Sequence, residues 1–540
     1  MHRFTGVAWV TMLVASFVSC GSLEASGTPS ATRLSSTDFI PSIQPVPRTV
    51  TPSSDEEYSF DRSVGVTFLV TGEIPYANQR QMMRVMEDSL DVRSRNPDQA
   101  VRAGGMDIEV ELHSSKEWAE DLLVAESKEV LRQAYEVETS PKGITVRAIH
   151  PEGLLYGIAT AVQLVQVSDN HYHVPAVLIR DWPHYLERYV SEYHIPGWEF
   201  YDWLSTQKIN GFATAYRALN WDGLSSEMLE GLERIGSYVQ SHGTMRHLAQ
   251  LHIGGRGGPR MRIGNPEELA QLLRTVDTLI DVGAATHIMI CYDDVSPALT
   301  AAEQDLFESP AHAHVWLLNE VREHLDQRNE DIVLSFVPPY YRGFRHHTWR
   351  DHDRAELGHQ YLAFLRNWDR EDVPIVWTGP VTESRDIRAD DVWRYREAIG
   401  MQHSLLYWDN SWHYYQPLRV FNSSHPQGFA DTSPFRLVLL FVNGYSQAGR
   451  LFTRTAADFY WNPSDFDWVS SRRHAITMMA NRDAAAASDR FYEFRGESTW
   501  ARFARSGATA DAYQTLLELS DLAPESSLIQ DALTTWRKSF

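Results

Sequence analysis

The chain has 540 residues, which is enough for two or three domains with buried cores of their own. Hydrophobic residues make up 43% of it and charged residues 22%, as in ordinary water-soluble globular proteins. The formal net charge of −22, without any long basic block, argues against nucleic acid as a partner, because phosphate recognition needs a basic surface.

Residues 1–20 have the pattern of an export signal. Arg3 precedes the apolar run Val7–Val18, which is too short for a comfortable membrane span. The run ends in Phe17-Val18-Ser19-Cys20, which resembles a bacterial lipoprotein cleavage box with Cys20 as the lipidated residue. We therefore expect export to the bacterial cell envelope, with either a lipid anchor on Cys20 or a free periplasmic or secreted form. A cytoplasmic protein with an apolar N-terminal helix is the weaker alternative.

Only one cysteine other than Cys20 occurs in the chain, namely Cys291, so an internal disulfide framework is impossible. Cys291 lies inside an apolar run. This position favours a buried apolar role over that of a nucleophile.

The first folded unit follows a linker. Residues 21–54 are rich in Ser, Thr and Pro and predict a flexible tether. Residues 55–181 mix short strand and helix patterns, as in the alternating stretch Gly143–Ala148 and the amphipathic stretch Gly153–Val165. This region is predicted to be a small α+β domain.

Residues 182–469 alternate between strand and helix patterns at the spacing of βα units, which predicts a (β/α)8 TIM barrel. The expected strands are Arg188–Ser191, Phe212–Tyr216, Met245–Leu251, His287–Tyr292, Val333–Val337, Pro374–Trp377, Leu405–Trp408 and Arg450–Phe452. Residues 470–540 are rich in Ala and Leu and predict a helical C-terminal region. The expected fold class is therefore α/β, with the barrel between the α+β domain and these helices.

Two neighbouring carboxylates, Asp293 and Asp294, follow the apolar run that ends at Tyr292. The carboxyl ends of barrel strands meet at one mouth, where the chemistry of such folds collects. Successive residues point to opposite sides, so the two groups would address different atoms of one substrate, and their repulsion favours keeping one protonated. This division of roles fits glycoside cleavage. A solvated turn or a helix N-cap is the structural alternative.

Aromatic and amide side chains end the strands that follow. Tyr341, Trp377, Tyr407 and Trp408 could stack on the apolar faces of sugars, or could belong to the barrel core. Asp409 and Asn410 could bind sugar hydroxyls, or could form the turn after the strand.

A metal or phosphate site is not expected. His346, His347, His352 and His359 share one polar segment without a His-Glu-x-x-His pattern, which favours a solvated loop and helix start. The stretch Gly254–Gly258 lacks the Lys-Ser/Thr ending of a phosphate-binding loop and is expected to be a barrel loop.

Five motifs occur in order along the predicted barrel. They are Tyr292–Ser296, Val337–Tyr341, Trp377–Pro380, Trp408–Asn410 and Ala457–Pro463. In these motifs the chain resembles glycoside hydrolase family 84, the β-N-acetylglucosaminidases that include protein O-GlcNAc hydrolases and bacterial enzymes once called hyaluronidases. The resemblance extends from about Ile43 to Asp467 and includes the α+β domain.

The resemblance implies a retaining, substrate-assisted mechanism in which the acetamido oxygen of the sugar forms an oxazoline intermediate. Asp293 would orient and polarise the acetamido N–H. Asp294 would protonate the leaving oxygen and later activate water. The family pattern needs no cofactor and no metal, and the partner it implies is a glycan or glycoconjugate containing N-acetylhexosamine.

The resemblance also implies sugar contacts. Tyr341 would hydrogen-bond near the acetamido oxygen, and Trp377 would floor the acetamido pocket. Asp409 would hold the outer hydroxyls, with Asn410 beside it, and Asn443 would contact the sugar or its acetamido group.

Two strand ends depart from the family pattern. Glu192-Tyr193-His194-Ile195 replaces Glu-Gly-Phe-Tyr-Gly, and Ala215–Ala218 places Arg217 where the family has a lysine. The part of the expected site that would contact the 3- and 4-hydroxyls of the sugar is therefore altered. Arg217 could instead bind a carboxylate on an acidic glycan. Two alternatives stand beside a β-N-acetylhexosaminidase: a non-catalytic glycan-binding surface protein on the same fold, and a two-carboxylate glycosidase of another family.

Overall fold

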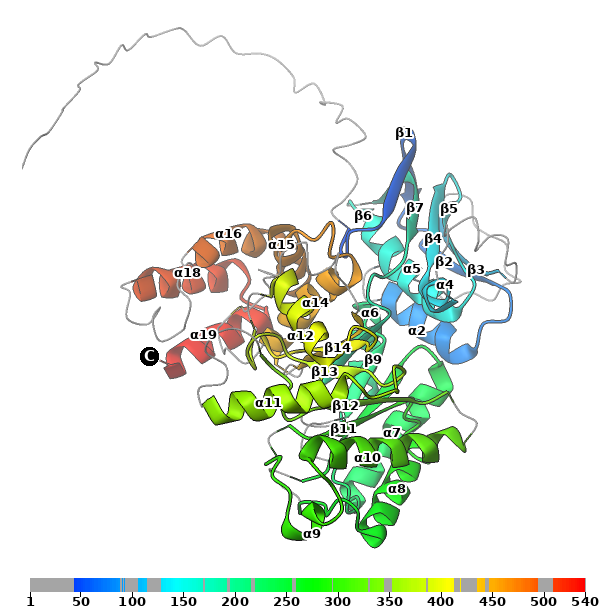
Figure 1. Cartoon of the computed structure of the whole chain (residues 1–540). Coiled ribbons are helices and arrows are strands. Elements are labelled where there is room, and N and C mark those ends of the chain that lie inside the picture. Colours follow the sequence, from blue (N-terminus) through cyan, green and yellow to red (C-terminus); the bar gives the residue numbers. More distant parts are fainter. Residues whose placement is uncertain are drawn as a thin grey trace, which may run out of the picture.

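A computed structural model gives the fold of the chain (Figure 1). It describes residues 43–87, 90, 92, 105–113, 128–168, 170–191, 195–214, 219–254, 259–293, 295–328, 331–343, 352–384, 387–411, 418, 435–441, 446–493 and 508–539. These residues form an N-terminal α+β domain, a closed barrel and a group of C-terminal helices, as the sequence predicted.

The N-terminal domain is built on one sheet with strand order β1-β7-β4-β5-β3-β2 and β6 beside β7. Its strands are β1 (Thr49–Asp61), β2 (Val66–Thr71), β3 (Met106–Leu112), β4 (Tyr135–Ser140), β5 (Gly143–Ala148), β6 (Gln166–Val167) and β7 (His171–Asp181). Its helices are α2 (Tyr76–Glu87), α4 (Lys128–Gln133) and α5 (Pro151–Leu164). The domain starts earlier than the predicted boundary at residue 55, because β1 begins at Thr49 and the side chain of Ile43 is already buried in the core.

The barrel closes in the order β10-β11-β12-β13-β14-β15-β8-β9, with every described pair of strands parallel. The strands are β8 (Glu187–Ser191), β9 (Gly211–Thr214), β10 (Arg246–His252), β11 (His287–Cys291), β12 (Val333–Val337), β13 (Ile375–Trp377), β14 (Leu405–Asp409) and β15 (Phe435–Phe441). The surrounding helices are α6 (Trp198–Thr206), α7 (Ser226–His242), α8 (Pro266–Asp281), α9 (Ala301–Gln304), α10 (Pro310–Asp326), α11 (His352–Leu365) and α12 (Ala389–Ile399). Seven of the eight predicted strands are confirmed.

The predicted eighth strand, Arg450–Phe452, is wrong. These residues lie in helix α14 (Gln447–Trp461). Ser446 is its N-cap, and the Ser446 Oγ accepts a hydrogen bond of 2.9 Å from the Gly449 N–H. The barrel is closed instead by β15, which pairs with both β14 and β8. Residues 437–441 form a continuous apolar run, the pattern of a strand buried on both faces, and this signal outweighs the shorter run at 450–452.

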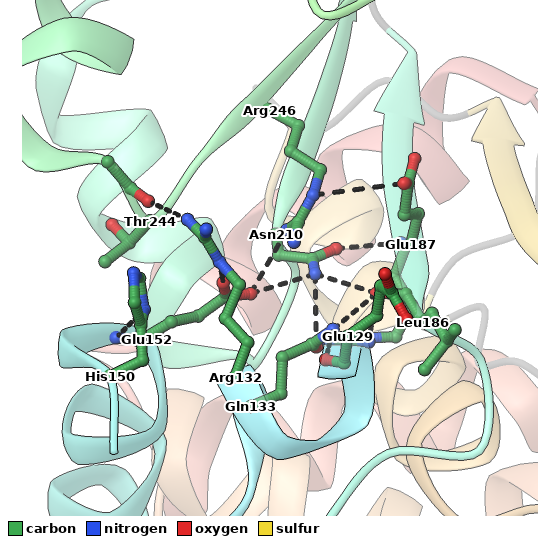
Figure 2. A network of polar contacts seen from close by, with 12 residues as sticks. Glu129, Arg132, Gln133, His150, Glu152, Leu186, Glu187, Asn210, Thr244 and Arg246 are labelled. Atoms are coloured by element: carbon green, nitrogen blue, oxygen red, sulfur yellow. Dashed lines mark hydrogen bonds and ion pairs between the residues drawn. The ribbon is translucent and has the colours of Figure 1, made fainter. Parts of the chain in front are cut away.

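The N-terminal domain contacts the barrel near the start of β9 and β10, and Figure 2 shows the polar network at this contact. Glu152, in the first turn of α5, has no solvent exposure and accepts hydrogen bonds from Arg132 (2.9 Å), Arg246 (3.2 Å) and Asn210 (3.0 Å). Arg246 opens β10 and Asn210 directly precedes β9. Burial alone would raise the pKa of the Glu152 carboxyl, but the two arginines and the Asn210 bond outweigh it and lower this pKa to about 2. The N-terminal domain thus contacts the amino-terminal end of the barrel, and active sites of such barrels form at the opposite, carboxyl end.

After α14 the chain forms α15 (Trp468–Met479), α16 (Arg482–Glu493), α18 (Ala508–Leu522) and α19 (Ser527–Ser539), which share a core of their own. The predicted helical C-terminal region is confirmed in these residues. Across the described part of the chain, every helix is too short or too polar to cross a membrane.

Candidate active site in the barrel mouth

Two hydrophobic clusters separate the side chains that fill the barrel from those that face the helices. The inner cluster takes at least one residue from each of the eight strands: Tyr189, Ala213, Leu248, Met289, Cys291, Val337, Val376, Leu406, Trp408, Leu437 and Leu439. The outer cluster takes the alternating strand residues together with residues of the surrounding helices. Membership of a cluster therefore shows on which side of its strand a residue points.

Asp293 points into the barrel. Along β11 and its continuation, Met289 and Cys291 belong to the inner cluster, whereas Tyr292 belongs to the outer one. The Tyr292 ring stacks on His314 of α10 at a centroid distance of 3.8 Å, and its hydroxyl donates to the His314 carbonyl at 3.3 Å. This anchor holds Tyr292 outward, so the next residue, Asp293, turns inward.

The Asp293 carboxylate lies at the carboxyl end of the barrel and is 7% exposed. One of its oxygens is within 4.8 Å of a ring nitrogen of His252 and of the Cys291 sulfur. Burial, followed by the charge of Asp293, raises the pKa of the Cys291 thiol well above its usual value. The thiol is therefore protonated and apolar in character, as the sequence suggested, and the acidic side chain of Asp293 lies on the inner side of the barrel end. The catalytic role of Asp293 stays a prediction.

The predicted pocket floor, Trp377, lies on the other side of its strand. Its side chain has no exposure, belongs to the outer cluster, and stacks on Tyr395 of α12 at 5.6 Å with an interplanar angle of 27°. Its strand neighbour Val376 is the one that faces inward. The geometry therefore does not bring Trp377 to the mouth, and its assignment to a pocket floor is corrected.

Trp408 is the tryptophan that the barrel turns inward. It belongs to the inner cluster, as does Leu406 two residues earlier, and it is 4% exposed. Tyr341 packs against this same cluster and is partly exposed. The structure thus gathers Asp293, Trp408 and Tyr341 at the carboxyl end of the barrel.

Asp409 is placed differently from the expectation that it binds sugar hydroxyls. It is fully buried on the outer side of β14, where the Tyr460 hydroxyl of α14 donates to Oδ2 and the Ser411 N–H donates to Oδ1 at 2.7 Å. Burial, then the charge of Asp409, raises the pKa of the Tyr460 hydroxyl, so it stays a donor. Asp409 therefore anchors α14 to the barrel in this structure, and the sugar-binding assignment is corrected.

Asn410 follows β14 at the mouth end. Its Nδ2 donates to the Thr382 carbonyl at 3.1 Å, which joins the loop after β14 to the loop after β13. In turn, the Thr378 N–H donates to the Tyr341 carbonyl at 3.0 Å, which joins that loop to the segment after β12. These bonds fix the rim on which Tyr341 and Asn410 stand.

The remaining predicted site residues lie outside the described residues. They are Asp294, Arg217, Asn443 and the lipidation residue Cys20. One residue of the mouth was not predicted, His252, which is 7% exposed at the end of β10. The predicted strand stopped at Leu251, and extending it by one residue would have placed His252 beside Cys291, with which it pairs in register.

An eight-stranded parallel barrel is the TIM-barrel fold, whose enzymes carry their active sites at the carboxyl end, where this chain places a buried acid and an inward tryptophan. Comparisons with known proteins narrow the class of enzyme to which the chain is similar. Residues 256–493 match the family model described as beta-N-acetylglucosaminidase, and residues 40–182 match that of glycosyl hydrolase family 20, domain 2.

Mouse protein O-GlcNAcase is 26% identical over 153 residues, which are 28% of this chain and 15% of that protein. The chain thus spans a small part of that relative. The solved structure of CpGH84B superposes on 92% of this chain and on 88% of its own chain, at 14% sequence identity and a TM-score of 0.62. The solved structure of the Flavobacterium johnsoniae chitobiase (FjGH20) superposes on 93% of this chain and on 92% of its own chain, at 12% sequence identity and a TM-score of 0.59. The chain is therefore similar to β-N-acetylglucosaminidases over residues 256–493 and to domain 2 of glycosyl hydrolase family 20 over residues 40–182.

Proposed function

We propose that the chain hydrolyses terminal β-linked N-acetylhexosamines with retention of configuration, using the acetamido group of the substrate as nucleophile. The observation that carries the proposal is the inward orientation of Asp293 at the carboxyl end of β11, inside the region that matches the beta-N-acetylglucosaminidase family model. The mouth also offers an aromatic surface, Trp408, of the kind on which sugars and acetamido groups pack.

In the proposed first step, the acetamido oxygen attacks the anomeric carbon while the glycosidic C–O bond breaks. Asp294 gives its proton to the leaving oxygen. The Asp293 carboxylate accepts a hydrogen bond from the acetamido N–H and balances the positive charge that develops on the amide. Because Asp293 is almost fully buried, its charge acts through a medium of low dielectric constant, where it stabilises such a cation more than in water.

In the second step water attacks the anomeric carbon of the oxazoline intermediate. Asp294, now a carboxylate, takes the proton of this water, and the oxygen returns to the acetamido group. The sugar leaves with the configuration that it had, because two inversions have taken place.

The test is hydrolysis of aryl β-N-acetylglucosaminide and aryl β-N-acetylgalactosaminide by the full chain, with Asp294→Asn as the inactive control. We expect release of the aryl group and tight inhibition by a thiazoline that mimics the oxazoline, since only an acetamido-assisted site should prefer that shape. Binding of these sugars without any release would instead favour a non-catalytic glycan-binding protein. Hydrolysis of sugars lacking the acetamido group would favour a two-carboxylate glycosidase.

The substrate class is proposed to be a glycoconjugate with N-acetylhexosamine at its end. Arg217, which stands where the family motif has lysine, is proposed to favour a glycan that carries a carboxylate. If Arg217→Lys and the wild type hydrolyse a plain aryl β-N-acetylglucosaminide at the same high rate, Arg217 has no such role.

Export with a lipid anchor on Cys20 is proposed from the signal-like residues 1–20. In a bacterial host we expect the full chain in the membrane fraction and the Cys20→Ser variant outside it. Equal distribution of both would contradict the anchor.

A further inference from the structure

Three side chains with different donor atoms meet at the barrel mouth. His252 offers a ring nitrogen, Cys291 a sulfur and Asp293 a carboxylate oxygen, and these atoms all lie within 4.8 Å of one another. All three residues are buried, at 7% exposure or less. Among the described residues, these three form the one group of at least three possible metal-ligating side chains whose ligand atoms come this close together.

The backbone holds these residues in place from both sides. His252 and Cys291 are direct partners on the neighbouring parallel strands β10 and β11, so their side chains point to the same side of the sheet. The His252 N–H donates to the Leu219 carbonyl and its carbonyl accepts from the Trp221 N–H, both at 3.0 Å. The Tyr292 N–H donates to the Val337 carbonyl at 2.9 Å, which extends the pairing of β11 up to Asp293.

The donor set selects a class of cation. A thiolate, an imidazole and one carboxylate suit Zn²⁺ and related thiophilic ions, whereas Mg²⁺ and Ca²⁺ prefer oxygen ligands only. Bonds of about 2.0 to 2.3 Å to Zn²⁺ place tetrahedral ligands roughly 3.3 to 3.8 Å apart. Because the present separations are 4.8 Å or less, each would have to shorten by about 1.5 Å at most. Three protein ligands leave the fourth position open to water.

We propose that His252, Cys291 and Asp293 form a binding site for a thiophilic divalent cation of the zinc class. As the metal–sulfur bond forms, the Cys291 thiol gives its proton to solvent. Resting on the proposed function, the consequence is inhibition: an Asp293 carboxylate that binds a cation cannot accept a hydrogen bond from the acetamido N–H. Zinc should therefore inhibit hydrolysis reversibly and in competition with the sugar.

The binding test uses Co²⁺ as the probe on the full chain, stripped first with a chelator and measured without any substrate. We expect one equivalent to bind with a thiolate-to-cobalt charge-transfer band in the near ultraviolet. Cys291→Ser should lose this band, and His252→Asn should bind Co²⁺ at least about tenfold more weakly. Circular dichroism in the presence of chelator verifies that each variant is folded.

The matched control is the double variant His346→Asn and His347→Asn, which removes histidines of the polar segment and should leave the band and the affinity unchanged. A missing band in the wild type, or a band that survives in Cys291→Ser, would overturn the proposal. So would the loss of binding in the histidine control.

The activity arm compares, for each variant, the rate with Zn²⁺ to its own rate with chelator. We expect strong Zn²⁺ inhibition of the wild type, relieved by raising the sugar concentration, and a ratio near one for Cys291→Ser. The two proposals can fail separately. Binding of Co²⁺ through Cys291 without hydrolysis of any sugar would support the cation site and contradict the proposed function. Hydrolysis without the cobalt band would support the proposed function and contradict the cation site.

Discussion

The buried Glu152 at the junction between the N-terminal domain and the barrel allows a quantitative test of what holds the two together. Glu152→Gln keeps the shape of the side chain and removes its charge, leaving Arg132 and Arg246 without their shared carboxylate. The pKa of this carboxyl is lowered from 4.5 to about 2, and one pKa unit corresponds to about 1.4 kcal/mol, so the charge is worth about 3 kcal/mol at pH 7. Measured losses on breaking buried ion pairs are of the same order, about 3 to 5 kcal/mol.

The assay is urea unfolding of wild type and Glu152→Gln at several pH values, followed by tryptophan fluorescence. Because the folded-state pKa is lowered, the stabilisation is fully present above pH 4.5 and is lost as the pH falls toward 2. The difference between the two proteins should therefore be constant above pH 5 and shrink below pH 4.5. The control is Glu138→Gln, whose carboxylate pairs with Arg147 but is 49% exposed, and which should cost less than about 1 kcal/mol. Equal losses of stability in both variants would contradict a stabilising role of the buried Glu152 charge.

Buried histidines should make the fold sensitive to mild acid: burial lowers the pKa of His247 to about 4 and those of His287 and His314 to about 3. Unfolding lets each take up a proton below pH 6.5, so the melting temperature should fall steadily between pH 6.5 and 5, and a flat profile there would count against neutral buried rings. In kinetic and thermal measurements, Trp408→Ala should raise KM for the aryl β-N-acetylglucosaminide, whereas Trp377→Ala should cost about 3 to 5 kcal/mol of stability. A raised KM in Trp377→Ala and a large loss of stability in Trp408→Ala would instead place the Trp377 ring inside the barrel and the Trp408 ring outside it.

The barrel was predictable because its parallel strands are buried on both faces and therefore appear in the sequence as short apolar runs, as in Val333–Val337. The same property hides which way each side chain points. Trp377 and Trp408 both end apolar strands, and nothing in the alternation of their neighbours distinguishes inward from outward. Only the register of neighbouring strands, through Val376 and Leu406, shows that the barrel contains the second tryptophan and excludes the first.

Asp409 illustrates a second limit of the sequence. A carboxylate at the end of a barrel strand resembles a ligand-binding group, but its partner here is Tyr460, 51 residues further along the chain on α14. Because the region of α14 was predicted to supply a strand, this contact could not be anticipated. By contrast, the inward position of Asp293 follows from simple alternation after Cys291, once Tyr292 is known to pack on α10.

The most direct test of the account is the rate at which the wild type and Asp293→Asn hydrolyse aryl β-N-acetylglucosaminide, set against the matching aryl β-glucoside that lacks the acetamido group. We expect cleavage of the first sugar only, and a loss of about 10²- to 10³-fold in kcat when Asp293 can no longer carry a charge. Comparable cleavage of the glucoside, or an Asp293→Asn variant as fast as the wild type, would contradict it.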